Sequence, residues 1–130
     1  MLVFNYSDYV DTATGRFRYR DGGAVEPDAN ITVFDDYTQT AVLNTMAVDQ
    51  ITKLGEHGGL GNERFFLLSW TLTPTFGDPS IEILANDANA QLPNVLSYEV
   101  FVAGYPKPNI VFIDYLENSV AQSIILYNFW

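Results

Sequence analysis

A short apolar segment that ends in a carboxylate sets the strongest constraint on the fold. Residues 109–113 are almost uniformly apolar and rich in β-branched and aromatic side chains, and the run stops at Asp114. A strand that is apolar on both faces is usually covered on both sides, as in a parallel sheet connected by helices. Barrel and open α/β enzymes place their chemistry at the carboxyl ends of such strands. Asp114 is therefore the first candidate for a functional residue.

Three further apolar segments predict strands, at residues 2–6, 31–34 and 64–72. Each changes from apolar to polar at its carboxyl end. The polar residues at these ends are Asn5 and Asp8, Asp35 and Tyr37, and Ser69 and Thr71. Because the carboxyl ends of parallel strands meet at one edge of a sheet, we expect these residues and Asp114 to form a common polar rim.

Helical patterns separate the later strands. Apolar residues at helical spacing predict a helix over residues 40–54, ended by Gly55, and a short helix that Ser80 caps. The following region, residues 91–108, is interrupted by prolines and is expected to be loop with some helical or extended pieces. A last helix is expected to begin with Asn118 as its cap. With mostly helical connections, parallel pairing of the strands follows.

The residues between the first two predicted strands are polar and rich in turn signals. Arg16, Arg18 and Arg20 alternate with aromatic residues, which suggests one face of a hairpin or an exposed loop. The arginines are interpreted either as a solvated surface or as a loop over an anionic substrate. His57 is the only histidine, and the glycine-rich sequence around it indicates a solvated loop.

Composition narrows the function classes. At 130 residues with 48% apolar residues, the chain is expected to fold as a single domain, residues 1–130. A net charge of −10 argues against nucleic acid and against electrostatic adhesion to anionic membranes. The chain has no cysteine, so thiolate metal sites and disulfides are excluded. The first ten residues show no signal-peptide pattern, and no apolar run is long enough to cross a bilayer.

Four segments carry a resemblance to a known family. In order they are DANITVFDDYTQT at residues 28–40, DQITKLGEHGG at 49–59, RFFLLSWTLTP at 64–74 and PNIVFIDYLEN at 108–118. Together they resemble the C-terminal half of bacterial phosphatidylinositol-specific phospholipase C and its X-domain relatives. The resemblance covers most of the chain from about residue 30 onward and extends to residues 2–9. It implies half of a (β/α)₈ TIM-type barrel, with about four parallel strands and flanking helices, completed by another chain or a second copy.

The resemblance also implies a reaction and roles for residues. In this family the inositol 2-hydroxyl attacks the phosphodiester, two histidines act as base and acid, and an arginine stabilises the developing charge. Asp114 matches the last-strand carboxylate that orients the base histidine. Asp35 and Tyr37 resemble the pair that holds the inositol ring. Trp70 would line the same mouth if its side chain points to the rim, and otherwise it packs in the core. Asn5 stands where many relatives have an arginine that contacts the headgroup.

The departures from the family pattern limit the expected activity. Both catalytic histidines and the phosphate-binding arginine belong to the N-terminal half, and His57 is expected at the opposite end of the strands. We therefore expect a phosphodiesterase part that is inactive alone and acts with its N-terminal half on an inositol-like phospholipid headgroup. Two alternatives remain open: a non-catalytic half-barrel that binds a polyol, sugar or lipid headgroup and homodimerises, and a self-assembling structural subunit.

Two further expectations concern metal binding and the location of the protein. No cofactor is expected, with Ca²⁺ as an alternative because it takes several oxygen ligands. Its candidate ligands are Asp8, Asp35, Asp36 and Asp114, whose spacing is not that of an EF-hand. The family resemblance implies an extracellular location.

Overall fold

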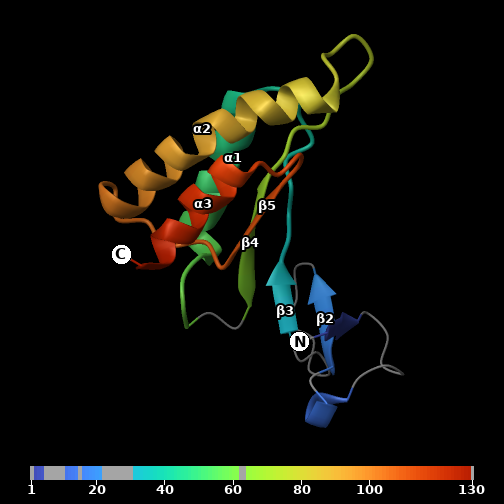
Figure 1. The fold of residues 1–130 in the computed structure, drawn as a ribbon, viewed down its shortest axis with the longest axis vertical. Coiled ribbons are helices and arrows are strands. Elements are labelled where there is room, and N and C mark those ends of the chain that lie inside the picture. The colour runs from blue at the N-terminus through green and yellow to red at the C-terminus, as the bar shows by residue number, and fades with distance from the viewer. Residues whose placement is uncertain (1, 5–10, 15, 22–30, 62–63, 130) are drawn as a thin grey trace.

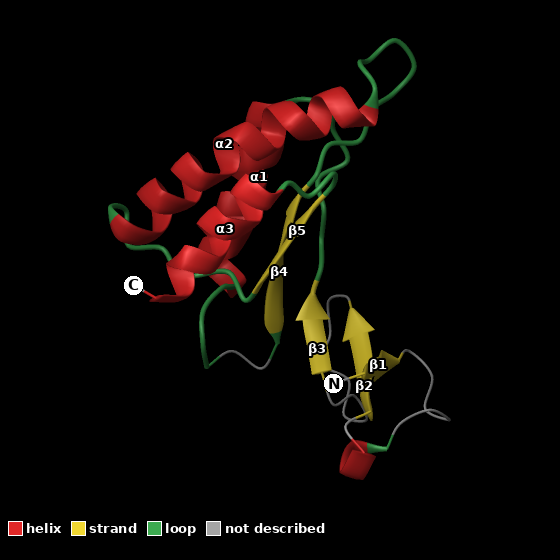
Figure 2. Ribbon diagram, in the orientation of Figure 1, coloured by secondary structure: helices red, strands yellow, loops and turns green. Residues whose placement is uncertain are grey.

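Parallel strands and helices alternate along most of the chain (Figures 1 and 2). The computed structural model describes residues 2–4, 11–14, 16–21, 31–61 and 64–129. The strands are β1 (Leu2–Phe4), β2 (Arg16–Asp21), β3 (Ile31–Phe34), β4 (Phe65–Trp70) and β5 (Ile110–Ile113). The helices are α1 (Leu43–His57), α2 (Ile81–Phe101) and α3 (Asn118–Leu126), with short 3-10 turns at Thr12–Thr14 and Tyr127–Phe129.

The described strands form one sheet whose order follows the sequence, β1-β2-β3-β4-β5, and each strand is parallel to its neighbour. The α/β class with parallel strands is thereby confirmed. The longest described pairing joins β4 to β5, from Leu67 opposite Ile110 to Trp70 opposite Ile113. A sheet that never reverses its order differs from a doubly wound sheet, in which the order reverses at a switch point.

The second strand corrects the sequence interpretation. Residues 16–21 were expected to be a hairpin face or an exposed loop, but β2 is a strand inside the sheet, paired with β1 at Leu2–Arg16 and with β3 at Tyr19–Ile31. Alternation of arginine with aromatic residues has the period of a strand. The charged side chains suggested an exposed segment, but they do not prevent the backbone of β2 from pairing with a strand on each side.

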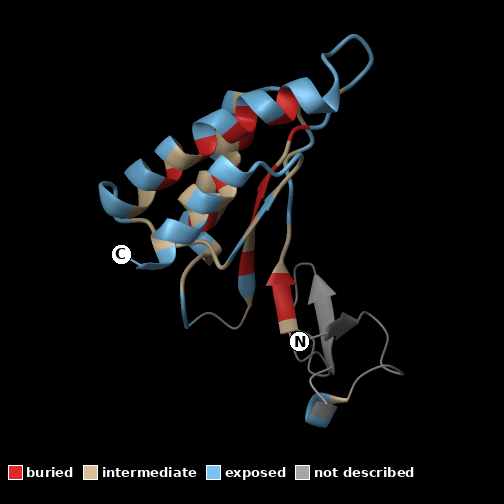
Figure 3. Ribbon diagram, in the orientation of Figure 1, coloured by how far each residue is buried: buried red, intermediate tan, exposed pale blue. Residues whose placement is uncertain are grey.

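All three helices lie on the same side of β4 and β5 (Figure 1). Phe66, Leu68 and Trp70 of β4 are at most 1% exposed and pack in a core with residues of all three helices. Figure 3 shows this buried layer where the helices face the sheet. The helical residues of the core are Met46, Leu54, Leu84, Ala88, Leu92, Leu96 and Val120. Burial of such side chains, at about 1.5–3 kcal/mol each, holds the helices to this face.

Helix α2 is longer than the short helix expected after Ser80, because it continues through Pro93 to Phe101 and takes in the first part of the region expected to be loop with some helical or extended pieces. A proline inside a helix costs about 3 kcal/mol, because it lacks an N–H and its ring crowds the preceding turn. Leu92 and Leu96 lie in this part of α2 and are at most 1% exposed. Their burial contributes about 3–6 kcal/mol together and outweighs the cost of the proline.

Helix α1 also continues past its expected end. Gly55 was expected to terminate it, but the helix ends at His57 and the backbone N–H of Gly58 donates to Leu54 O. A Cβ atom at residue 55 would lie 2.7 Å from the ring of Tyr105. Gly55 therefore permits the close packing of that ring against α1. At the start of α3 the cap position is Glu117 and not Asn118.

Candidate functional site

A cavity of about 550 Å³ opens at the carboxyl ends of β3, β4 and β5. Its polar lining consists of Asp35, Tyr37, Ser69, Thr71, Thr73 and Asp114. Its apolar lining consists of Leu67, Leu72, Pro74, Ile81 and Phe112. Ligand sites commonly have this size and this mixture of an apolar surface with a few convergent polar groups.

Five residues that the sequence assigned to a common polar rim line this cavity: Asp35, Tyr37, Ser69, Thr71 and Asp114. Asp35 follows the last residue of β3, Tyr37 lies two positions further, and Asp114 follows the last residue of β5. Asp35 Oδ1 accepts a hydrogen bond from Ser69 Oγ at 3.1 Å, which ties the end of β3 to β4. Tyr37 is 50% exposed, and its hydroxyl accepts a hydrogen bond from Gln39. Carboxylates from two different strands therefore share one opening.

Trp70 does not line the cavity as the resemblance implied, and it packs in the core, which was the other interpretation of this residue. The side chain is 1% exposed, and its indole N–H donates to Ala88 O in α2 at 2.8 Å. Successive side chains of a strand point to opposite faces. Ser69 faces the cavity, so Trp70 faces the helices.

Two other expectations concern Asn5 and the metal alternative. Asn5 and Asp8 lie outside the described residues. Within the part of the chain that the structure describes, no group of three or more histidine, cysteine, aspartate or glutamate side chains could hold a metal ion. Asp36 instead forms an ion pair with Lys53 at 2.9 Å.

His57 is not a solvated loop residue, as the sequence had suggested. It is the last residue of α1, and its ring stacks on that of Phe34 with 4.0 Å between the centroids. The guanidinium of Arg64 lies 5.0 Å from the centre of the same Phe34 ring. Helix α1 leads from the carboxyl end of β3 to the amino end of β4. The end of α1, with His57, therefore lies near the amino ends of the strands, whereas Asp35 lies at their carboxyl ends.

A polar network from α1 supports the segment that follows β3. Lys53 bonds Asp49 at 2.7 Å and the carbonyl of Asp36 at 2.9 Å, and Thr38 donates to Asp49. Burial alone would raise the pKa of Asp49, but hydrogen bonds from Lys53, Thr38 and Gln50 and the charge of Lys53 outweigh it and hold this pKa below its ordinary value. Burial alone would lower the pKa of Lys53, and its bonds to Asp49 and Asp36 raise it instead.

Two buried carboxamides, which sequence reasoning missed, contact the backbone beside the cavity. Gln50 of α1 is 0% exposed and bonds both the segment after β3 and β4. Asn89 of α2 is 3% exposed, and its Nδ2 donates to Asp114 O at 2.8 Å and to Tyr115 O at 3.3 Å. Tyr115 has a positive φ of 52°, so Asn89 holds a sharp backbone turn immediately after β5.

The sequence did carry a signal for these two residues. Gln50 lies four residues from Met46 and from Leu54, so it is a polar residue within the apolar stripe of its helix. Asn89 has the same kind of position between Ala85 and Leu92 in α2. A buried polar side chain requires hydrogen-bond partners, and at these positions the sheet provides them.

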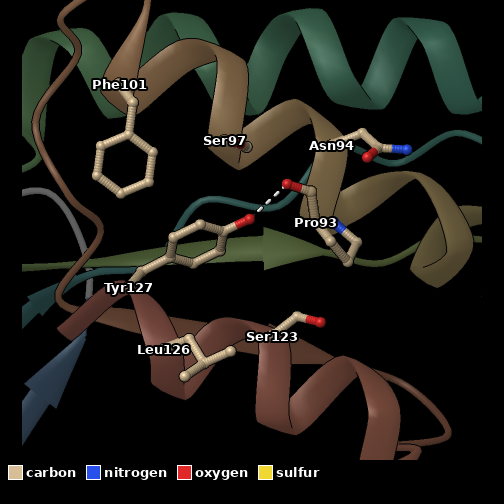
Figure 4. Close-up of a pocket in the computed structure, with 7 residues that line it drawn as sticks. All are labelled: Pro93, Asn94, Ser97, Phe101, Ser123, Leu126 and Tyr127. Carbon is tan, nitrogen blue, oxygen red and sulfur yellow. Dashed lines mark hydrogen bonds between the residues drawn. The ribbon is translucent and has the colours of Figure 1, made fainter. Parts of the chain in front are cut away.

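A second hollow of about 510 Å³ lies between α2 and α3 (Figure 4). Its lining residues are Pro93, Asn94, Ser97, Phe101, Ser123, Leu126 and Tyr127. The hydroxyl of Tyr127 donates to Pro93 O at 2.5 Å, and burial raises the pKa of this tyrosine. None of the described residues in its lining has a carboxylate or a basic side chain, so this hollow lacks the chemical groups that distinguish the cavity at the strand ends.

The fold and the cavity define an α/β protein with an acidic, hydroxyl-rich opening at the carboxyl ends of parallel strands. Searches of protein-family models, of curated proteins and of solved structures found no match to the chain. None of the described helices is long and apolar enough to cross a membrane.

Proposed function

We propose that the cavity binds the polyol ring of an inositol-like lipid headgroup. The proposal rests mainly on one observation: Asp35 and Asp114, from the ends of two different strands, line the same opening. Ionised carboxylates accept hydrogen bonds strongly, and a ring with several hydroxyl groups offers several donors to them. Ser69 and Thr71 add hydroxyl groups that donate or accept, and the exposed ring of Tyr37 offers a flat face.

We further propose that the chain is the C-terminal part of a phosphatidylinositol-specific phospholipase C-like phosphodiesterase. In this scheme Asp114 orients a base histidine that another polypeptide supplies, and Asp35 and Tyr37 hold the ring. None of the described lining residues is a histidine, lysine or arginine. Each general acid or base contributes about 10²- to 10⁴-fold in rate, so the chain should be inactive without its partner. An extracellular location belongs to this proposal, because it follows from the same resemblance.

The sheet offers a place for such a partner. Phe65, Ile110 and Phe112 are on the face away from the helices and are 46%, 39% and 51% exposed. In a complete barrel this face would be the packed interior. The sequential strand order, with helices on one side of β4 and β5, fits half of such a barrel. The N-terminal half, or a second copy of this chain, would cover these side chains.

A non-catalytic function is the second candidate, and the chemistry of the lining favours it. Carboxylates and hydroxyl groups suffice to bind a neutral polyol, whereas cleavage of a phosphodiester also requires a cationic group for the developing charge and a general acid and base, and none of the described lining residues is a histidine, lysine or arginine. Under this alternative the chain binds a sugar or polyol and homodimerises through the open face of its sheet. The two candidates share the ligand and differ in whether turnover follows when a second half is added.

Binding is tested by titrating the isotopically labelled chain with myo-inositol and following amide NMR shifts. We expect saturable shifts at residues around Asp35 and Asp114. Loss of a hydrogen bond to a charged group costs about 1.5–3 kcal/mol, so Asp35→Asn and Asp114→Asn should each weaken binding about tenfold or more. Asp87→Asn changes an exposed carboxylate of α2 and should leave binding unchanged. Equal binding by all four proteins would refute the assignment of the cavity.

Turnover is tested with phosphatidylinositol vesicles. The chain alone should release no cyclic inositol phosphate, and adding an N-terminal half of a phosphatidylinositol-specific phospholipase C in trans should give turnover that Asp114→Asn reduces. Turnover by the chain alone would contradict the proposed division of labour. Binding of myo-inositol without turnover in the mixture would favour the non-catalytic candidate.

A further inference from the structure

The pairing of β3 with β4 stops short beside the cavity. Its register covers Val33 opposite Phe65 and Phe34 opposite Phe66. On the other side of β4, the pairing with β5 continues to Trp70. The segments that follow β3 and β4 meet again further on, where the Thr73 N–H donates to Thr40 O at 2.8 Å. Between these two points the chain segments are separated, and Asp35 lies at the start of the separation.

Gln50 bridges this gap with its side chain. Its Nε2 donates to Asp36 O at 2.9 Å, and its Oε1 accepts from the Ser69 N–H at 2.9 Å. A carboxamide carries the same donor and acceptor as a backbone peptide group. The side chain of Gln50 therefore lies between the two segments and forms the hydrogen bonds that the backbone of an intervening strand would form. Gln50 belongs to helix α1, and its side chain is 0% exposed.

The surrounding groups fix the orientation of this carboxamide. Nε2 also lies 3.2 Å from Asp49 Oδ2, so the nitrogen faces acceptors. Oε1 faces the Ser69 N–H, which can only donate. The reverse orientation would place oxygen against the Asp36 carbonyl and nitrogen against an N–H group. The side chain thus has one satisfied orientation, and that orientation defines the separation of the two segments.

Both ends of this bridge adjoin Asp35. One is the carbonyl of the next residue, Asp36, and the other is the backbone of Ser69, whose Oγ donates to Asp35 Oδ1 at 3.1 Å. We propose that Gln50 is a positioning residue that holds the ends of β3 and β4 apart and thereby sets the place of the Asp35 carboxylate at the cavity. This inference rests on the proposed polyol site for its function, but its structural content can be measured without ligand.

The test compares wild type with Gln50→Met, which keeps the length of the side chain and removes both hydrogen bonds. Gln122→Met, at an exposed position of α3, is the matched control. Without ligand, the Ser69 amide should exchange at least tenfold faster in Gln50→Met. The Phe66 amide of the same strand is bound by Asn109 Oδ1 at 2.8 Å and should keep its rate, which separates a local change from general loosening.

Binding of myo-inositol provides the second readout. Gln50→Met should weaken it three- to tenfold in the wild-type background and have no further effect when combined with Asp35→Asn, because the residue acts through that carboxylate. A further loss in the combined variant would indicate a merely structural role and would overturn the inference. If Gln50→Met does not fold, Gln50→Asn replaces it, since it keeps the carboxamide but is one methylene too short to contact both Asp36 O and the Ser69 N–H.

The outcomes separate this inference from the proposed function. If wild type binds myo-inositol and Gln50→Met binds it equally well, the positioning role is refuted and the polyol site stands. If wild type does not bind, the polyol site is refuted and the exchange rates decide the rest. In that case faster exchange at Ser69 alone supports the bridge, and unchanged exchange refutes it.

Discussion

Replacement of Trp70 by phenylalanine separates the stability of the fold from the chemistry of the cavity. The indole is 1% exposed and donates to Ala88 O at 2.8 Å. Trp70→Phe removes this hydrogen bond, at about 1 kcal/mol, and leaves space beneath α2 that costs about 1–2 kcal/mol more. The free energy of unfolding should therefore fall by about 2–3 kcal/mol, measured by urea denaturation monitored by circular dichroism. Binding of myo-inositol should not change in the folded protein.

The control for this prediction is Phe76→Leu. Phe76 is fully exposed in the loop between β4 and α2, so its replacement should change the free energy of unfolding by less than about 0.5 kcal/mol. The reasoning would be refuted if Trp70→Phe abolished binding of myo-inositol while leaving the free energy of unfolding at the wild-type value. That result would place the indole at the cavity instead of in the core.

Two further predictions concern the groups that hold the strand ends. Lys53→Met should destabilise the protein at pH 7. The difference from wild type should shrink below pH 3.8, the ordinary pKa of Asp49, because the stabilisation that comes from the lowered pKa of Asp49 is lost as this carboxylate becomes protonated in the folded protein. Thermal melts at several pH values would measure the difference. Asn89→Leu should lower the free energy of unfolding by about 1–2 kcal/mol, measured by urea denaturation, because two carbonyls after β5 lose their hydrogen-bond donor. The loss is limited because the substitution also removes Asn89 Oδ1, which has no hydrogen-bond partner. The control Asn94→Leu, at an exposed position of the same helix, should change the free energy of unfolding little.

The parallel α/β class could be predicted from the sequence because the patterns that indicate it lie within short segments of the chain. Apolar segments that stop at acids, separated by helical patterns, require parallel strands with their polar ends at one edge. This is why reasoning from the sequence could single out Asp35 and Asp114, which the structure brings to one cavity. The functions of these residues stay predictions, since their placement alone does not test binding or catalysis.

The elements that the sequence reasoning missed depend on tertiary contacts. The strand β2 has a charged pattern typical of an exposed segment, and only its two neighbours in the sheet make it an inner strand. The second half of α2 contains a proline, and the burial of Leu92 and Leu96 against the core decides in favour of the helix. Gln50 follows the same rule, because its partners come from strands distant in sequence.

Trp70 is a different case, because the sequence contained the answer. Ser69 and Thr71 were assigned to the polar rim, and the period of two then requires Trp70 to point the other way. An aromatic side chain next to a candidate site in the sequence suggests a role in binding. The alternation of side chains along a strand places this one on the opposite face of the sheet.

The two faces of β4 contact different parts of the protein, so the predictions on stability and the predictions on binding can be tested independently. Phe66, Leu68 and Trp70 pack against the helices, whereas Leu67 and Ser69 line the cavity on the other face. A change on the helix face should alter the free energy of unfolding and affect binding of the proposed polyol only through the fraction of folded protein. A change on the cavity face should alter the affinity for that polyol directly. Gln50 is the exception, because it reaches from the helical layer to the backbone of β4, and its replacement should affect both quantities at once.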